Sequence, residues 1–125
     1  MQTPSRPLRK FDFPGRTFHL EIMRGGMNRL LLRSNIKAPW TTRLEIIFMN
    51  VKYMDIATTM DGPVLEDLGS AEQYLGTLPW TLKQDLDLHF YKIRAVNGTG
   101  YLVGGDMAID ESAKGPDEPS NFFMM

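Results

Sequence analysis

The sequence predicts a mainly β protein, a small antiparallel sandwich or open barrel of about five to seven strands with one short helix. Residues 17–24 and 85–96 alternate apolar and polar side chains with the period of two that places one face of a strand on a core. Residues 44–60 are rich in β-branched and aromatic residues and contain no glycine or proline, which favours a strand over a helix.

Residues 1–16 contain three prolines and one glycine and are interpreted as an N-terminal arm rather than a strand. The arm is basic, and Phe11 and Phe13 lie among its charged residues. Phosphate contacts together with base stacking on these rings would make it a nucleic-acid-binding arm. The alternative, which we favour, is that the two phenylalanines pin the arm onto the core, because single-strand binders carry a basic groove across the whole domain.

Residues 17–34 predict a first β-hairpin. Gly25-Gly26 supplies the positive φ angles that tight hairpin turns require, and residues 29–33 form the returning strand. The chain then enters a loop that contains a proline and a tryptophan before it reaches the central stretch.

The central stretch, residues 44–60, changes phase in its middle. Leu44, Ile46 and Phe48 share one strand face, whereas the apolar residues after Asn50 fall on the opposite parity. We therefore expect a central strand that bends at this point, or two strands that meet at a tight corner.

The segment that follows leaves one assignment open. Residues 64–68 fit either a short strand or a helical turn. Ser70 and Gln73 have the spacing of a capping box, and Gly76 is well placed to end a helix. The sequence predicts its only helix over residues 70–76.

Residues 85–109 predict a second β-hairpin. Its first strand has the cleanest alternation in the chain, and Asn97-Gly98 is a strong signal for a type I′ turn. We expect residues 100–109 to form the return strand, weakened or bulged at a Gly-Gly pair.

The predicted organisation is one β-rich domain over residues 17–109, followed by a tail. A chain of 125 residues is long enough for one core. Residues 110–125 are acidic and without periodicity, and they end in the apolar run 122–125. That run either docks on its own domain or inserts into a groove of a partner, and we favour the first interpretation.

Composition excludes several classes of site. The absence of cysteine rules out disulfides, thiolate zinc sites and cysteine nucleophiles. The net charge of −1 combines a basic half, with ten basic and four acidic residues over 1–58, and an acidic half with four basic and eleven acidic residues. No apolar run is long enough to span a bilayer and no signal peptide is evident, so we expect a cytoplasmic protein without membrane contact.

Asp85, Asp87 and His89 share one strand face and are the best candidates for metal ligands. His19 and Glu21 would complete a carboxylate–imidazole site if the two strands were neighbours, and a metal-dependent hydrolase is therefore an alternative function. Residues on one strand face lie about 7 Å apart, however, and a solvated face explains the same pattern. The sequence predicts no metal, no cofactor and no catalytic residue.

Aromatic residues carry the prediction of a binding site. Trp40 and Trp80 each follow a proline in a loop, and loops on a β scaffold are where recognition residues concentrate. The alternative is that each tryptophan closes one end of the sandwich with its N–H bonded to a loop carbonyl. The predicted binding residues are Trp40, Tyr53, Trp80, Phe122 and Phe123.

These observations predict a non-enzymatic protein-binding module. One concrete form is an inhibitor or immunity-type protein that neutralises a partner enzyme, with the acidic half of the chain facing a basic toxin. Nucleic acid is not the expected partner, although the arm over residues 1–16 keeps a nucleic-acid-binding domain as a further alternative. A homodimer formed through an open strand edge is compatible with the sequence.

Overall fold

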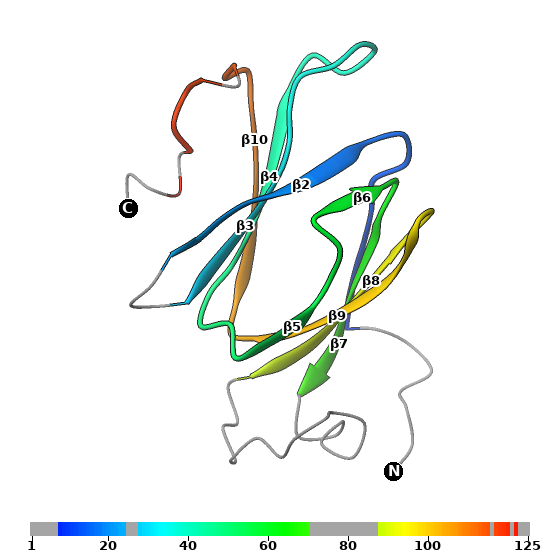
Figure 1. Ribbon diagram of the computed structural model, residues 1–125, viewed down its shortest axis with the longest axis vertical. Coiled ribbons are helices and arrows are strands. Elements are labelled where there is room, and N and C mark those ends of the chain that lie inside the picture. The colour runs from blue at the N-terminus through cyan, green and yellow to red at the C-terminus, as the bar shows by residue number, and fades with distance from the viewer. Residues whose placement is uncertain (1–7, 25–27, 71–87, 116, 121, 123–125) are drawn as a thin grey trace.

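The computed structural model is a sandwich of two antiparallel sheets with five strands each, and neither sheet closes into a barrel (Figure 1). The structure describes residues 8–24, 28–70, 88–115, 117–120 and 122. Sheet A has the order β1 (Arg9–Asp12), β7 (Val64–Ser70), β8 (His89–Ala95), β9 (Gly98–Gly104), β5 (Tyr53–Asp55). Sheet B has the order β10 (Met107–Ser112), β4 (Arg43–Phe48), β3 (Arg29–Ser34), β2 (Thr17–Arg24), β6 (Thr59–Asp61).

The predicted mainly β sandwich is confirmed, but it contains more strands than expected. The central stretch crosses from β4 in sheet B to β5 in sheet A, and Asn50 turns the corner with a φ of 51°. Asparagine tolerates this left-handed conformation better than most residues. The expected bend is thus a tight corner between two strands, which is one of the two forms that the sequence predicts.

The prediction of one bulged return strand over residues 100–109 is wrong. The chain leaves β9 at the Gly-Gly pair and enters β10 in the other sheet. The Gly105 N–H donates to Met49 O over 2.7 Å, and the Met49 N–H donates to Asp106 O over 2.9 Å. A Cβ on Gly104 or Gly105 would lie 3.2 Å from Met49 O, so glycine lets the two crossings approach each other.

Both predicted hairpins are present. β2 pairs with β3, with a register shift between Leu20 and Ile22, and β8 pairs with β9. The turn of the second hairpin lies at Val96 and Asn97, one residue before the predicted Asn97-Gly98 turn, because Gly98 already pairs with Ala95. The Asn97 side chain donates to Thr59 O over 2.8 Å, which ties this turn to β6 of the other sheet.

The assignment of residues 8–16 differs from the prediction, whereas at residues 64–68 the structure selects the strand, one of the two forms that the sequence left open. Residues 9–12 form β1 and pair with β7, so this part of the expected arm is a strand. Phe11 and Phe13 pack against the core, as the favoured interpretation of the arm expected, and their burial stabilises this strand. Residues 64–68 belong to β7, which ends at Ser70, the expected helix cap; the rest of the predicted helix lies outside the described residues.

The main core lies between the two sheets. Each of its large aliphatic and aromatic side chains contributes about 1.5–3 kcal/mol through burial. Phe48 of sheet B meets Tyr91 of sheet A edge to face, with ring centroids 5.0 Å apart. The Tyr91 hydroxyl donates to Gly105 O over 2.7 Å, so this aromatic pair also anchors the crossing from β9 to β10. No helix among the residues described has the length and apolar character needed to cross a membrane.

β4 is buried on both faces, although its outward face carries charges. Arg43 and Glu45 are both 0% exposed. Arg33 Nε of β3 donates to Glu45 Oε2 over 2.9 Å, and Arg43 Nη2 lies 3.4 Å from Glu45 Oε1. One carboxylate thus stands between two guanidinium groups in the middle of sheet B.

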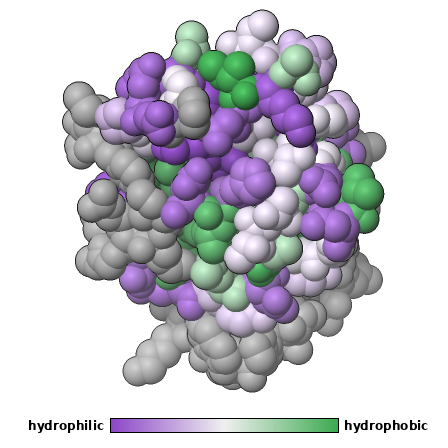
Figure 2. Space-filling model, turned by 45° about the horizontal axis from the view of Figure 1, so that its top comes forward, coloured by the Kyte–Doolittle hydropathy of each residue, from purple (hydrophilic) through white to green (hydrophobic). Residues whose placement is uncertain are grey.

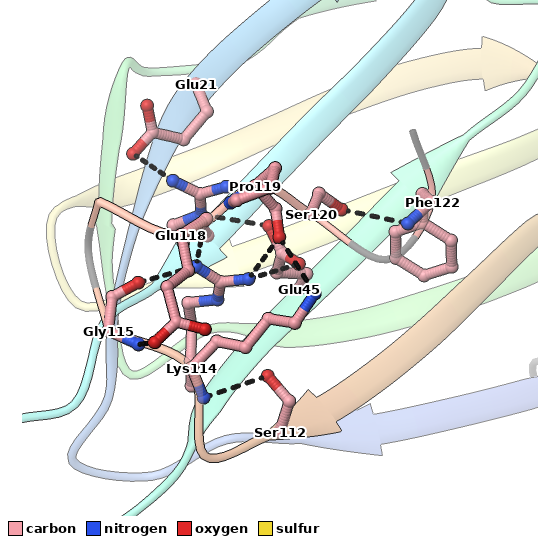
Figure 3. A network of polar contacts seen from close by, with 11 residues as sticks. Glu21, Glu45, Ser112, Lys114, Gly115, Glu118, Pro119, Ser120 and Phe122 are labelled. Carbon is pink, nitrogen blue, oxygen red and sulfur yellow. Dashed lines mark hydrogen bonds and ion pairs between the residues drawn. The ribbon is translucent and has the colours of Figure 1, made fainter. Parts of the chain in front are cut away.

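The C-terminal segment, residues 113–122, covers this charged face (Figure 3). Arg43 Nη1 donates to the carbonyl oxygens of Gly115 and Glu118 over 2.8 and 2.7 Å, and Nη2 donates to that of Pro119 over 3.2 Å. Carbonyl oxygens thus accept from both terminal nitrogens of Arg43, while its Nε is buried without a partner among the described residues. Burial of a guanidinium is tolerated only with such acceptors.

Phe122 fastens the end of the same segment. Its ring is 8% exposed and belongs to a small apolar cluster with Leu31, Ile47 and Met49 on the outer face of sheet B. Its backbone N–H donates to the hydroxyl of buried Ser120 over 3.1 Å. As far as residue 122, the tail therefore docks on its own domain.

Glu45→Met should destabilise the protein by about 3–5 kcal/mol, because it leaves the buried guanidinium of Arg43 without a counter-charge and leaves Arg33 only Glu21, whose Oε1 lies 3.7 Å from Arg33 Nη1. Urea unfolding of both proteins measures the difference in free energy. Glu66→Met is the matched control, since its partner Arg94 is 47% exposed, and it should cost less than about 1 kcal/mol. Equal losses in the two variants would contradict the buried network.

Phe122→Ala should destabilise the domain by about 3 kcal/mol, because it removes a ring packed on Leu31 and Ile47. Val96→Ala, at a side chain that is 87% exposed, is the control and should change stability by less than about 0.5 kcal/mol. Thermal unfolding with both variants measures the effect. A Phe122→Ala protein as stable as the parent would show that the C-terminal segment does not hold sheet B.

Candidate functional site

A groove of about 310 Å³ lies at the end of the sandwich where the β1–β2 and β3–β4 loops meet β10. We call it the loop-end groove. The β3–β4 loop stands at the top of Figure 1, and Figure 2 brings that end forward. This face is largely hydrophilic, and its apolar residues form small, separate patches. The groove residues used below are Asp12, Phe13, Arg16, Pro39, Trp40, Thr42 and Glu111.

Trp40 is held in place by the β1–β2 loop. Its indole N–H donates to Gly15 O over 3.3 Å, and the Arg16 guanidinium carbon lies 4.7 Å from the ring centroid. Gly15 adopts a φ of 77°, a conformation that glycine reaches without strain. Trp40 therefore closes this end of the sandwich, as the alternative interpretation expected, and its half-buried ring also forms one wall of the groove.

Among the described lining residues Arg16 is the only cation, and its guanidinium is bonded within the protein. The side chain is 4% exposed, and its two terminal nitrogens donate to Thr42 O and Thr42 Oγ1 over 2.9 and 3.0 Å. Burial lowers the pKa of Arg16, and the Coulombic attraction of Glu111 acts in the opposite direction. An arginine stays protonated at neutral pH, so this buried charge balances part of the negative charge nearby.

Two carboxylates line the groove, Asp12 and Glu111. Glu111 accepts a hydrogen bond from Thr42 Oγ1 over 2.5 Å and remains exposed. Asp12, at the end of β1, is also exposed, and within the described part of the chain it has no hydrogen-bond or ion-pair partner. The accessible charge of the loop-end groove is therefore negative.

A second polar cluster lies where β1, β7 and β8 meet in sheet A. Asp67 is 1% exposed and accepts from Arg9 Nε and Nη2 over 3.1 and 3.0 Å. His89 Nδ1 lies 2.9 Å from Asp67 Oδ1, and the Gly69 N–H donates to the same oxygen over 3.0 Å. Burial acts to raise the pKa of Asp67, but the hydrogen bonds from His89, Gly69 and Arg9 outweigh it and hold that pKa below its usual range.

The ionisable groups of this cluster are engaged in contacts with one another and with the backbone. Asp67 is occupied by Arg9, His89 and a backbone N–H, and the imidazole of His89 stacks on Tyr91 with centroids 6.0 Å apart. Burial raises the pKa of Tyr91 well above its usual value, and its hydroxyl is bonded to a carbonyl. The buried polar groups on the inward face of sheet A therefore have hydrogen-bond partners, so they can be packed between the two sheets.

The expected metal residues are not brought together by strand pairing. His89 lies on β8 of sheet A, whereas His19 and Glu21 lie on β2 of sheet B, so these strands are not neighbours. Asp85 and Asp87 lie outside the described residues. Among the residues that the structure places, no three potential histidine, cysteine or carboxylate ligands converge on one point.

The predicted binding residues occupy different parts of the molecule. Only Trp40 lines the loop-end groove, while Tyr53 packs against the Leu88–Phe90–Val103 cluster on sheet A. Phe122 is buried on sheet B, and Trp80 and Phe123 lie outside the described residues. Sequence reasoning missed Asp12, Arg16, Thr42 and Glu111, because no local pattern joins positions this far apart in the chain.

Comparisons with protein-family models, curated proteins and solved structures found no match to this chain.

Asp67→Asn should change how stability depends on pH. Because the folded-state pKa of Asp67 is depressed, its ionised form stabilises the protein above the unfolded-state pKa of about 3.9. That contribution is lost as the pH falls from this value through the folded-state pKa. Urea unfolding between about pH 3 and 7 should therefore show the parent and variant stabilities converging in acid.

Asp12→Asn controls for the loss of one negative charge in the same titration, because its carboxylate is exposed. Parallel stability profiles for the parent and Asp67→Asn would contradict a depressed pKa at Asp67.

Proposed function

We propose that the protein is a non-enzymatic protein-binding module and that the loop-end groove is its recognition surface. One observation carries the proposal: segments from three parts of the chain bring Trp40 and Asp12, whose carboxylate has no partner among the described residues, into the lining of one groove of about 310 Å³. Tryptophan is enriched in interface hot spots, and an isolated carboxylate offers a specific polar contact.

The lining residues favour binding over catalysis. The lining that the structure describes consists of aromatic, proline, threonine, leucine, arginine and carboxylate residues, without a histidine or a serine. Its single buried cation is committed to Thr42. Rigid walls that need no reorganisation reduce the entropic cost of association, and the anchored Trp40 ring fits that requirement.

The proposed partner is another protein, and an inhibitor or immunity-type role is the concrete form of this function. A negative groove would steer a basic enzyme toward the module and speed association at low ionic strength. Phe122 is not assigned to recognition, because it is committed to its own sheet. Homodimer formation through a sheet edge is less well supported, since three of the four edge strands, β1, β5 and β6, have only four, three and three residues, and β10 alone has six.

The test is capture of partners from native-source lysate with the full chain, read by mass spectrometry. Trp40→Ala should weaken capture of a stoichiometric partner by about tenfold or more, as expected for a hot-spot tryptophan. Asp12→Lys reverses the exposed charge without removing a core contact, and it should have an effect of the same sign.

Tyr101→Ala is the matched control, because Tyr101 is an exposed aromatic residue on β9 of sheet A, away from the groove. Circular dichroism and thermal unfolding establish that each variant is folded. A partner captured equally by the parent, Trp40→Ala and Asp12→Lys would place recognition elsewhere, and the absence of any partner would contradict a binding module.

A further inference from the structure

The loop-end groove combines an aromatic wall with accessible negative charge. Asp12 and Glu111 are exposed, whereas Arg16 is almost fully buried and its terminal nitrogens are bonded to Thr42. Lys37 lies on the same loop as Trp40 but does not line the groove. A cation entering the groove would therefore meet two carboxylates and no accessible positive side chain among the described lining residues.

The chain already shows how a guanidinium group packs in this place. Arg16 lies over the Trp40 ring at 4.7 Å while its nitrogens are held by oxygens of Thr42. Tryptophan has the most favourable ring for such cation–π contacts. Phe13 and Pro39 add apolar walls, along which the methylene groups of a long basic side chain can pack.

The negative charges of the groove disfavour an acidic ligand. An acidic side chain in the groove would meet the negative charges of Asp12 and Glu111, and Arg16 is buried with both terminal nitrogens already donating to Thr42. A purely apolar ligand would leave the carboxylate of Asp12 without a partner and partly desolvated, which costs free energy. Charge complementarity thus selects a cationic ligand.

We propose that the loop-end groove binds one basic side chain of the partner, a lysine or an arginine. Its cationic group lies between the carboxylates of Asp12 and Glu111, and its aliphatic part lies against Trp40. This inference rests on the proposed function, because it names the chemical group by which the partner would be recognised at the same groove.

The probes are N-acetyl-arginine amide and N-acetyl-lysine amide, with N-acetyl-citrulline amide as the neutral analogue of the first. The indole N–H signal of Trp40 in a ¹⁵N correlation spectrum reports binding, and Trp80→Phe assigns that signal. We expect saturable shifts with a dissociation constant on the order of 1–10 mM for a cationic probe, and at least about fivefold weaker binding of citrulline. The two cationic probes distinguish arginine from lysine as the preferred group.

The Asp12→Asn/Glu111→Gln variant should weaken binding of the cationic probe about fivefold or more, since it removes both carboxylate charges. Asp55→Asn/Asp117→Asn removes two exposed charges elsewhere and should leave the dissociation constant unchanged. Equal binding of citrulline, equal losses in both double variants, or no shift of the Trp40 signal at about 50 mM probe would overturn the assignment of a basic side chain. If a lysate partner were still lost with Trp40→Ala in those cases, the protein-binding function would stand without it.

Discussion

The buried charge network on the outer face of sheet B is the interaction on which the rest of the structure depends. Arg43, Glu45 and Arg33 lie at the centre of that sheet, and neither Arg43 nor Glu45 reaches solvent. The guanidinium groups of Arg43 and Arg33 need acceptors beyond the carboxylates of Glu45 and Glu21, because burial of an unsatisfied guanidinium costs several kcal/mol. Carbonyl groups of the C-terminal segment provide them, so the tail is a structural element of the domain.

The cover of the buried charges and the loop-end groove occupy different parts of the surface. The C-terminal segment covers the outer face of sheet B, and Phe122 adds apolar contacts to the polar ones. At one end of β10, the crossing at Gly105 is tied to Met49 and Tyr91. At the other end, Glu111 faces a groove whose carboxylates are still accessible. The loop-end groove therefore keeps exposed carboxylates, those of Asp12 and Glu111, which the buried charge network does not use.

Sequence reasoning found the elements whose signals are local. Period-two alternation located both hairpins, and the phase change near Asn50 located the corner of the central stretch. It failed where an element depends on distant contacts. Residues 9–12 form a strand because β7 provides an edge, and nothing in the proline-rich segment itself reveals that partner.

The site was predictable only in part for the same reason. Trp40 was identified from its place in a proline-containing loop, but its anchor at Gly15 comes from a different part of the chain. Asp12 and Glu111 are ordinary surface carboxylates by sequence, and only the fold brings them to one groove. Likewise, alternation in β4 identifies the inward face, whereas the covering of Arg43 and Glu45 depends on a segment about 70 positions away.

Native-state hydrogen exchange at the Phe122 amide tests whether the C-terminal segment is an integral cover of sheet B. That N–H is buried and donates to Ser120 Oγ. If the segment is such a cover, the Phe122 amide exchanges through global unfolding. It then has the same opening free energy and denaturant dependence as the amide of Ile46 in β4. Exchange at the rate of an unstructured peptide, with Ile46 still protected, would show that the segment detaches alone and would contradict the account.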